Sequence, residues 1–287
     1  MEIMEKAPAK INLGLDALYQ RPDGYHELEM IMASVDLSDR ITVRPLTKKT
    51  IELTTDSSFL PTDKKNHVYQ AAELLMERYG VTGGVAIDIE KKIPVAAGLA
   101  GGSSDCAATL RALNQLWDLD LSLEELAKLG SEIGSDVPYC IYGNTAYVSG
   151  RGEKVEKIAD IPCCYVILVK PHMSVSTQTV FKALNVKQAQ HPDIAGLRKA
   201  VEAHDYQAMI EKMGNTLEDV TILKYPVIRQ IKESMMKFGA DVALMSGSGP
   251  TVFCLVKQEK RAQRIYNALK GFNDEVYLVR MLQCAVE

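Results

Sequence analysis

The sequence predicts an α+β protein with two lobes. In its first half, segments that alternate apolar and polar residues are mixed with segments whose apolar residues recur at helical spacing. In its second half, strand-like and helical segments follow in the order β-α-β-β-α-β, with extra helices in the first crossover. A chain of 287 residues, 47% of them hydrophobic, is long enough to bury the cores of two such lobes.

The first lobe is expected to combine short strands with three helices. Alternating residues predict strands over 41–45, 51–55 and 85–90. Apolar residues at helical spacing predict helices over 66–79, 104–117 and 122–133.

The second lobe has a clearer pattern, which is that of a ferredoxin-like domain. We expect strands over 164–170, 241–246, 251–256 and 275–281, several helices within 177–238, and a helix over 258–269. The polar stretch 150–162 is the expected join. The sequence therefore predicts an N-terminal lobe over residues 1–158 and a C-terminal lobe over residues 159–287.

Composition excludes some classes of function. The net charge of −4 leaves no positive surplus for general binding to nucleic acid. The first residues are acidic where a secretory signal needs a basic start, and no apolar run is long enough to span a membrane. A cytoplasmic protein that binds neither nucleic acid nor membrane is expected, and no feature predicts its oligomeric state.

The cysteines are expected to be reduced residues of the core. They are dispersed through apolar surroundings, with no C-x-x-C pair and no histidine at metal-ligand spacing. Buried thiols are therefore favoured over a metal site or a disulfide framework. The six residues are Cys106, Cys140, Cys163, Cys164, Cys254 and Cys284.

A glycine-rich loop over 94–105, PVAAGLAGGSSD, is the main functional signal. It follows a strand-like segment and leads into a helix, whose first amides have no acceptor within the helix. Glycines let the backbone bend tightly and approach a ligand, while Ser103 and Ser104 can cap the helix and donate to phosphate oxygens. The sequence therefore predicts that residues 94–105, which we call the phosphate loop, bind a polyphosphate. A serine-capped turn alone would explain an isolated G-G-S-S.

This loop lacks the GK[ST] ending of a Walker loop and the G-x-G-x-x-G spacing of a dinucleotide fold. The segment PVAAGLAGGSSDCAATL instead resembles the P-x-x-x-G-L-x-x-S-S motif of the GHMP kinases. APAKINLGLD near the N-terminus and MSGSGPTVF near the C-terminus resemble the first and third motifs of that family, so the resemblance covers nearly the whole chain. It implies a ribosomal-S5-like N-terminal lobe, a ferredoxin-like C-terminal lobe, and transfer of the γ-phosphate of ATP to a hydroxyl group.

By the same resemblance, the loop and one residue upstream of it bind ATP, and magnesium accompanies the nucleotide. No pair of carboxylates in the sequence marks a protein site for the metal. The expected ATP-binding residues are Asn66, Pro94, Gly98, Leu99, Ala100, Gly101, Gly102, Ser103 and Ser104.

Three segments narrow the expected acceptor. AKINLGLD, RPDGYHELEM and IGSDVPYC resemble the family members that phosphorylate the 2-hydroxyl of 4-diphosphocytidyl-2-C-methyl-D-erythritol, in the non-mevalonate route to isoprenoid precursors. One departure is Cys106 in SSDCAA, where alanine is more usual. Both residues are small, so the departure changes little.

The resemblance also implies two catalytic residues. Asp136, in GSDVP, is the candidate general base for the attacking hydroxyl. Lys10, in AKIN, would lower the pKa of that hydroxyl and neutralise charge on the γ-phosphate. Without the motifs, Asp136 would be explained as an aspartate bonded to local amides at a helix end, and Lys10 as a solvated lysine.

Five further residues are expected to bind the acceptor. The turn signal Pro22-Asp23-Gly24 would project Tyr25 and His26 from a loop, where they would stack on and read the cytosine, although packing is the commoner role of such a pair. The other three are assigned by their positions in the motifs and the second lobe: Asn12, Thr177 and Gly247. Asn66 has an alternative reading as the N-cap of a helix.

Two rival functions remain open at this stage. Another GHMP kinase, acting on a mevalonate-type, homoserine or sugar acceptor, would have a similar phosphate loop. A non-catalytic binding protein could also keep this fold and bind RNA, since fold does not determine function. The Tyr-His pair, GSDVP and the negative net charge favour the kinase of a cytidine-containing acceptor.

Overall fold

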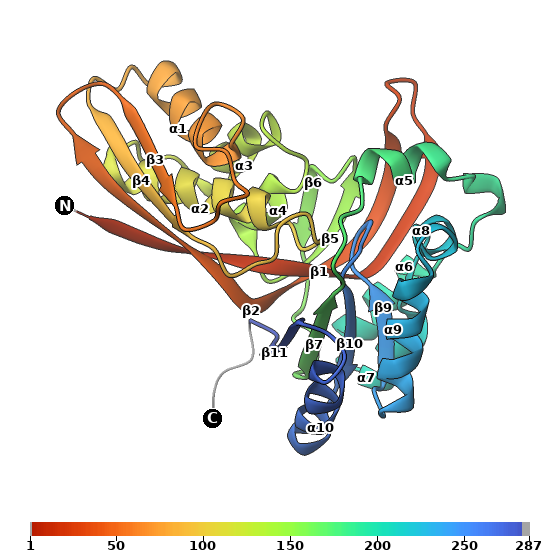
Figure 1. Cartoon of the computed structure of the whole chain (residues 1–287). Helices are drawn as coiled ribbons and strands as arrows, with labels where there is room; N and C mark the ends of the chain where they lie inside the picture. The colour runs from red at the N-terminus through yellow and green to blue at the C-terminus, as the bar shows by residue number, and fades with distance from the viewer. Residues whose placement is uncertain (1, 283–287) are drawn as a thin grey trace. The chain divides into compact units, whose positions relative to one another are not determined.

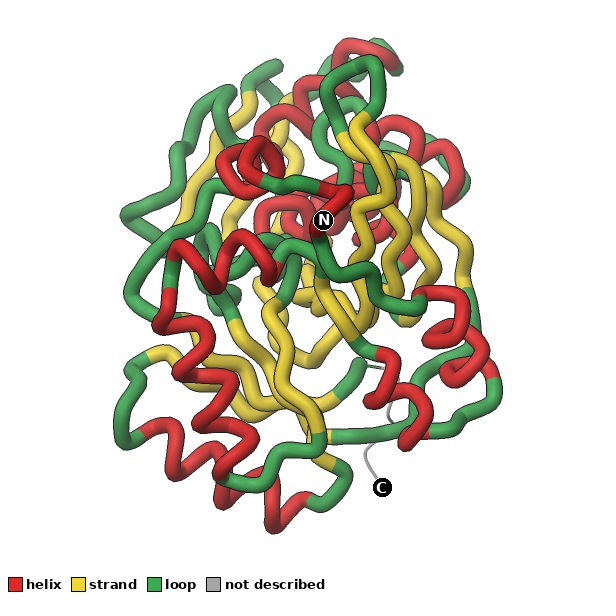
Figure 2. The backbone as a smooth tube through the Cα atoms, turned by 90° about the vertical axis from the view of Figure 1, so that its right-hand side faces the viewer, coloured by secondary structure: helices red, strands yellow, loops and turns green. Residues whose placement is uncertain are grey.

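The computed structural model describes residues 2–282 (Figure 1). Helices and strands both recur along the chain (Figure 2), which confirms the α+β class. The chain forms two compact units of interleaved segments. One unit comprises Met1–Ala9, Leu37–Val95 and Ala100–Gly143, and the other comprises Lys10–Asp36, Ala96–Leu99 and Asn144–Glu287. The contiguous lobes proposed above, which meet between residues 158 and 159, stay a prediction.

In the first unit, a helical layer accompanies three paired strands. The end of β2 (His26–Leu46) pairs antiparallel with β4 (Gly84–Glu90), and β4 pairs parallel with β3 (Ile51–Thr55). In β3 and β4, buried residues alternate with more exposed ones, which is the pattern of a sheet with one face on the core. The strands predicted over 41–45, 51–55 and 85–90 lie in these three elements.

The helices of the first unit are α1 (His67–Arg78), α2 (Gly101–Leu116), α3 (Leu123–Ser131) and α4 (Val137–Tyr142). α2 packs against α1, α3 and α4. It buries small residues such as Ala107 and Ala108, which let its neighbours approach closely. Ser122 and Glu125 form a capping box at the start of α3.

In the second unit, part of β1 (Ile3–Gln20) pairs parallel with β8 (Gly214–Asn215). The start of β2 pairs antiparallel with β5 (Thr145–Gly150), which pairs with β6 (Lys154–Lys157). The larger sheet has the strand order β3-β4-β2-β1-β8, with β5 on β2. β1 and β2 are much longer than the predicted strand 41–45. Their full length was not predicted, because their buried stretches are nearly continuous runs without the alternation that marks a strand.

The second sheet has the order β11-β7-β10-β9, and all neighbours are antiparallel. Numbered along this part of the chain, the order is four-one-three-two, as a ferredoxin-like β-α-β-β-α-β unit requires. Two helices, α9 (Pro226–Lys237) and α10 (Glu259–Lys270), pack against it. The predicted C-terminal architecture is confirmed. Its strands are β7 (Tyr165–Lys170), β9 (Val242–Met245), β10 (Val252–Val256) and β11 (Glu275–Arg280).

The extra helices of the first crossover lie within the predicted range 177–238. They are α5 (Thr177–Ala183), the short 3-10 helix Val186–Gln188, α6 (Ile194–Glu202), α7 (Tyr206–Lys212) and α8 (Glu218–Lys224). Ser176, Asp193 and Asp205 accept from backbone N–H groups at the starts of α5, α6 and α7.

The cysteine prediction needs one correction. Four of the six are free and buried as expected, but Cys163 is exposed and bonded in a disulfide. Cys163 is exposed whereas the next residue, Cys164, is buried, so only one of the two side chains faces the core. Cys284 lies outside the described residues. The free cysteines are Cys106, Cys140, Cys164 and Cys254.

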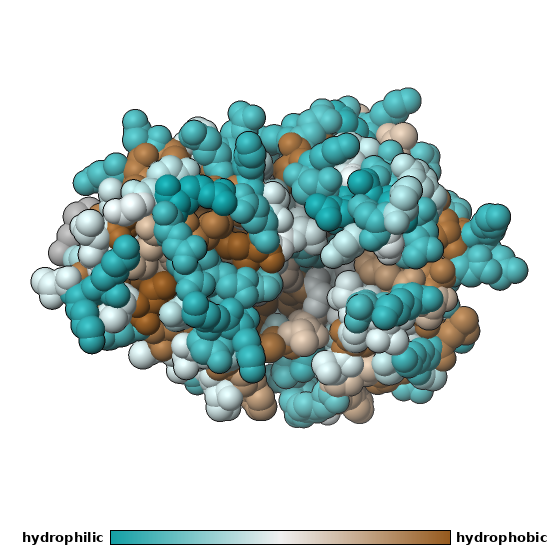
Figure 3. Space-filling view, turned by 90° about the horizontal axis from the view of Figure 1, so that it is seen from above, coloured by the Kyte–Doolittle hydropathy of each residue, from teal (hydrophilic) through white to brown (hydrophobic). Residues whose placement is uncertain are grey.

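The surface is mostly polar where it can be followed. On the face in Figure 3, hydrophilic residues predominate and hydrophobic ones form small separate patches. Among the helices described, none has the length and apolar character that a membrane span requires.

Candidate active site

The glycine-rich loop opens a helix, as predicted, but the helix begins earlier. Ala100, in a left-handed conformation (φ 56°), is the N-cap of α2. The first helical hydrogen bond runs from the Ser104 N–H to the Ala100 carbonyl at 2.9 Å. The amides of Gly101, Gly102 and Ser103 therefore have no acceptor within the helix and suit an anion.

The prediction that serine caps this helix is wrong. The N-cap has no side-chain hydrogen bond, and both serines lie inside the first turn. The buried Ser104 hydroxyl donates to the Pro8 carbonyl at 2.7 Å, so it anchors the helix to β1. Ser103 is only half-buried. The error arose because Gly101 and Gly102 were read as loop residues, whereas both have entered the helix.

In the second unit, the turn between β9 and β10 is hydrogen-bonded to Ala97 and Gly98 of the phosphate loop. The Ser246 hydroxyl donates to the Gly98 carbonyl at 3.0 Å, and the Thr251 amide donates to the Ala97 carbonyl at 3.3 Å. The buried side-chain amide of Asn215 donates to the carbonyls of Met245 and Gly247, both at 2.8 Å. Through these contacts the turn holds the phosphate loop in place.

Asn215 was not found from the sequence. It lies on the two-residue strand β8, which no pattern marks. In the sequence, Asn215 is an uncharged polar residue followed by a threonine. Such a pair is too common to single out a position.

In the first unit, the loop that carries Asp136 lies next to the start of α2. Asp136 is the half-buried N-cap of α4, and its side chain makes no capping hydrogen bond. A methyl group placed on Gly134, two residues earlier, would lie 3.9 Å from Ser103 Oγ. The loop that carries Asp136 therefore packs against the first turn of the helix that offers free amides.

His67 is a neighbour of this place that the sequence did not indicate. It is the first residue of α1, and its Cε1 would lie 3.8 Å from a methyl group on Gly134 and its Nδ1 4.0 Å from one on Gly102. Burial lowers its pKa, so its ring is neutral at pH 7 and can both donate and accept a hydrogen bond.

In the second unit, Lys10 and Asn12 lie together on β1, with side chains on the same face. The Lys10 ammonium donates to Asn12 Oδ1 at 2.7 Å, and both residues are buried. The Lys10 amide donates to the carbonyl of Leu99 at 3.1 Å, which ties β1 to the phosphate loop. A methyl group on Gly247 would lie 3.6 Å from both Lys10 Nζ and Asn12 Oδ1. Four predicted site residues therefore meet around Lys10.

The Tyr25–His26 pair is only partly as predicted. The turn 21–25 is formed, with the Gly24 amide donating to the Arg21 carbonyl, and Tyr25 is 59% exposed. The guanidinium of Arg151 lies 5.1 Å from the centre of its ring. Tyr25 is thus an exposed aromatic residue with a guanidinium over one face of its ring.

His26, by contrast, does not project from the loop. It is the first residue of β2 and is buried, because the strand begins immediately after the turn. Its ring centre lies 5.1 Å from that of Phe181 on α5, and burial lowers its pKa. Phe181 lies in the range 177–238, for which the sequence predicted only helices. Its ring is a neighbour of His26 that the sequence did not indicate.

Asn66 and Thr177 have structural partners. Asn66 is the N-cap of α1: its Oδ1 accepts from the Val68 amide and its Nδ2 donates to the Pro61 carbonyl. The N-cap reading of Asn66 is therefore confirmed. Thr177 begins α5 and shares a hydrogen bond of 2.8 Å with the Ser248 hydroxyl, next to Gly247.

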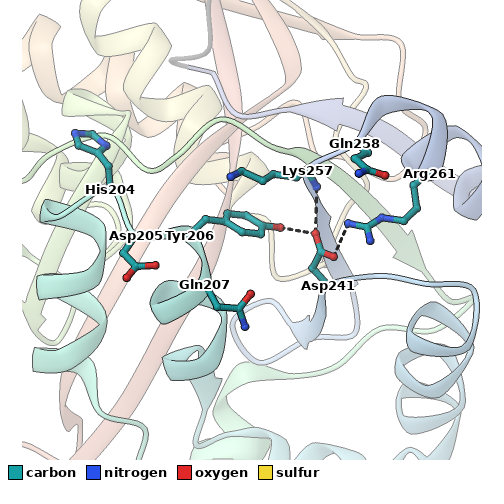
Figure 4. Close-up of a pocket in the computed structure, with 8 residues that line it drawn as sticks. All are labelled: His204, Asp205, Tyr206, Gln207, Asp241, Lys257, Gln258 and Arg261. Atoms are coloured by element: carbon teal, nitrogen blue, oxygen red, sulfur yellow. Dashed lines mark hydrogen bonds and ion pairs between the residues drawn. The ribbon is translucent and has the colours of Figure 1, made fainter.

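A cavity of about 530 Å³ elsewhere in the second unit lies among α7, β9 and the start of α10 (Figure 4). Its polar groups satisfy one another. The Asp241 carboxylate accepts from the Tyr206 hydroxyl at 2.9 Å, from the Lys257 amide at 3.1 Å and from Arg261. This arrangement ties α7 and α10 to the sheet, and it contains none of the predicted site residues.

Within residues 2–282, no cluster of three or more histidine, cysteine or acidic side chains is arranged to hold a metal ion. Magnesium in nucleotide sites is usually held by phosphate oxygens, waters and one or two protein groups, so this absence is compatible with metal that arrives with the nucleotide.

Comparison with known proteins agrees with this geometry. The model of the GHMP kinase N-terminal domain matches residues 66–144, and that of the GHMP kinase C-terminal domain matches residues 197–274. The first match contains the phosphate loop and Asp136, and the second contains the supporting turn. The chain belongs to the GHMP kinase family.

Individual relatives are similar over nearly their whole length. A protein of Enterococcus faecalis named 4-diphosphocytidyl-2-C-methyl-D-erythritol kinase is 61% identical over 283 residues, covering 99% of this chain and 100% of the relative. The Bacillus subtilis protein of the same name is 55% identical and covers 98% of each chain. A crystal structure titled 4-(cytidine 5'-diphospho)-2C-methyl-D-erythritol kinase superposes with a TM-score of 0.83 at 31% identity, covering 97% of this chain and 99% of that chain. A homoserine kinase of Cytophaga hutchinsonii shares the fold, with a TM-score of 0.80 at 24% identity.

Proposed function

We propose that this protein transfers the γ-phosphate of ATP to the 2-hydroxyl of 4-diphosphocytidyl-2-C-methyl-D-erythritol, in the non-mevalonate pathway to isoprenoid precursors. The observation that supports it most directly lies in the first unit. The loop that carries Asp136 packs, at Gly134, against Ser103 in the first turn of α2. Amides that suit a polyphosphate are thus close to the loop of a carboxylate that can accept a proton. The names of the full-length relatives give the acceptor.

In the proposed reaction, the acceptor oxygen forms a bond to the γ-phosphorus while the bond from that phosphorus to the bridging oxygen of ADP breaks. The hydroxyl proton passes to the carboxylate of Asp136 late in the step, because phosphoryl transfer proceeds through a loose transition state. Most of the rate comes from alignment of the reactants and from stabilisation of charge on the transferred group.

Lys10 supplies positive charge for this step. Its ammonium is held by Asn12 and its backbone by Leu99, so the charge is fixed in place before substrates bind. A preorganised charge needs no reorientation as the transition state forms. Asn12 and Gly247, which lie beside the ammonium, are proposed to contact the acceptor.

Magnesium is proposed to accompany ATP, where it would supply positive charge that neutralises part of the charge of the phosphates. The half-buried Ser103 is the protein hydroxyl of the loop that we assign to the phosphates. Ser104 directs its amide to Ala100 and its hydroxyl to Pro8, and so stabilises the helix start from within.

The cytidine part of the acceptor is proposed to bind at Tyr25 and His26. Tyr25 offers an exposed ring for stacking, and the neutral ring of His26 can donate one hydrogen bond and accept another. Phe181, against His26, adds apolar surface for a base. Thr177, bonded to Ser248, is proposed to lie with the diphosphate. We keep the cytoplasm as the expected location, since ATP is a substrate.

Replacing Tyr25 with alanine is expected to raise the KM for the acceptor about tenfold or more, because stacking on an aromatic ring contributes about 1–3 kcal/mol per base. The KM for ATP should stay within about twofold. Steady-state kinetics with each substrate varied in turn measures both values. Tyr19→Ala is the matched control, since Tyr19 is another exposed tyrosine of the second unit, 54% accessible. Equal changes in the two KM values would contradict the stacking role of Tyr25.

The proposed function is tested with purified protein, Mg·ATP and a panel of acceptors. The panel contains 4-diphosphocytidyl-2-C-methyl-D-erythritol, mevalonate, homoserine and galactose. ADP release should occur at a substantial rate only with the first, and phosphorus NMR of the product should show a new phosphomonoester. ADP release with a different acceptor would identify another member of the family, and release with none would contradict kinase activity.

A further inference from the structure

A buried cluster of Asp39, Lys91 and Asp105 lies in the first unit, beneath the phosphate loop. The Lys91 ammonium contacts Asp39 Oδ2 and lies 2.8 Å from Asp105 Oδ2. The side chains of Lys91, Asp39 and Asp105 are 8%, 0% and 3% exposed. These contacts make Lys91 the centre of a buried group of charged side chains.

The cluster joins the two ends of the phosphate loop. Lys91 directly follows β4 and precedes the loop, while Asp105 lies in α2, just after it. Asp39 Oδ1 accepts from the amides of Lys92 at 2.5 Å and Ile93 at 2.8 Å, which fixes the chain where it leaves β4. The loop therefore begins and ends on one set of side chains.

The cluster also lies directly beneath the first residue of α2. A methyl group placed on Gly101 would meet Lys91 Nζ at 3.3 Å and Ile93 Cγ2 at 3.1 Å. Gly101 carries the first of the amides that lack an acceptor within the helix. The position of Lys91 thus sets how closely the start of α2 can approach the strand below it.

The pKa shifts of Lys91 and Asp105 reflect both their burial and their mutual contacts. Burial, together with the charge of Asp39, raises the pKa of Asp105 to about 8 even though Lys91 opposes the shift. Burial lowers the pKa of Lys91, but Asp105 and Asp39 outweigh burial and the net shift is upward. The raised pKa of Asp105 favours its protonated form and so reduces the negative charge that the cluster buries.

We propose that Asp39, Lys91 and Asp105 are positioning residues for ATP, which pin both ends of the phosphate loop and hold the amides at the start of α2 where the phosphates bind. This inference rests on the proposed function. Lys91 acts from beneath the helix and is not a ligand of the nucleotide. Its effect is therefore transmitted through Asp39 and the backbone of the loop.

The test uses the full chain and three variants, Lys91→Met, Asp39→Asn and Asp105→Asn. Calorimetry measures the Kd of a non-hydrolysable ATP analogue with Mg²⁺ and the Kd of adenosine. Lys91→Met and Asp39→Asn should weaken the ATP analogue about tenfold or more and leave adenosine within about twofold, since only the phosphates contact the loop amides. Asp105→Asn should change neither value more than about threefold, because an amide has the shape of a protonated carboxyl group.

Lys92→Met is the matched control. Lys92 is the next residue after Lys91 and its side chain is exposed, so this variant loses the same charge outside the cluster. It should leave both Kd values within about twofold. An equal loss in Lys92→Met would mean that general charge, and not the cluster, governs binding. Unchanged affinity for the ATP analogue in Asp39→Asn, or an equal loss for adenosine in Lys91→Met, would overturn the proposal. If Lys91→Met does not fold, Asp39→Asn gives the answer.

The outcome is separable from that of the proposed function. If the wild-type protein binds the ATP analogue but phosphorylates none of the acceptors, the proposed reaction is overturned. The Kd values of the variants can then still be measured by calorimetry. Wild-type protein that does not bind the analogue overturns both proposals. A merely structural role for the cluster would lower the melting temperature and the active fraction, but would not raise Kd selectively for the nucleotide that carries phosphates.

Discussion

Replacing Asp136 with asparagine is expected to lower kcat by a factor of about 10² to 10⁴, the range that general acid–base groups usually contribute. The amide has the shape of the carboxylate but cannot accept the proton of the acceptor hydroxyl. Binding of ATP should survive, because the phosphates are proposed to rest on the amides of Gly101–Ser103. Single-turnover kinetics measures the chemical step, and calorimetry measures nucleotide affinity.

The control for this variant is Asp120→Asn, which removes the same charge from an exposed aspartate of the first unit. Its kcat should stay within about twofold of wild type. Asp136→Asn protein that turns over at a near-normal rate would remove Asp136 from the mechanism. A loss of ATP affinity comparable to the loss of kcat would instead indicate that Asp136 supports the nucleotide site.

Replacing Gly98 with alanine should disrupt the phosphate loop. Gly98 has φ +77°, and a methyl group there would lie 2.4 Å from the Ser246 carbonyl oxygen and 3.0 Å from that of Gly249. The left-handed conformation alone costs a non-glycine residue about 1–2 kcal/mol, and the overlap forces the backbone to move. We expect the KM for ATP to rise about tenfold or more, with a lower melting temperature.

Gly80→Ala separates these two effects. Gly80 also has a positive φ (+62°), but a methyl group there would meet nothing within 4 Å. This control should lower stability by about 1 kcal/mol and leave the KM for ATP unchanged. If Gly98→Ala resembles Gly80→Ala in both measurements, the close contact between the loop and the turn at Ser246 does not matter for nucleotide binding.

The C-terminal lobe was predictable because its elements are short and separated by clear turns. Its strands, such as 251–256, are bounded by glycine, proline or polar residues, and the order of elements alone indicates a ferredoxin-like unit. The long strands β1 and β2 were harder to predict, because a run buried on both faces loses the alternation that marks a strand. Chain periodicity therefore worked best where one face of an element meets solvent.

In the candidate site, motifs located residues more reliably than they described their surroundings. The phosphate loop and Lys10 could be found because glycines or a short motif mark them. The contact between His26 and Phe181 could not be found, since the two residues lie far apart in the chain. The partners of Lys91 were likewise hidden: Asp39 is distant in sequence, and Asp105 looks like an ordinary polar residue of a helix start.

The central claim is that the first amides of α2 hold the triphosphate of ATP. A crystal structure of the protein with a non-hydrolysable ATP analogue, Mg²⁺ and the acceptor tests it most directly. We expect phosphate oxygens within hydrogen-bond distance of the amides of Gly101, Gly102 and Ser103, and the acceptor 2-hydroxyl within reach of the Asp136 carboxylate. Nucleotide bound at another place, with these amides left to solvent, would contradict the account.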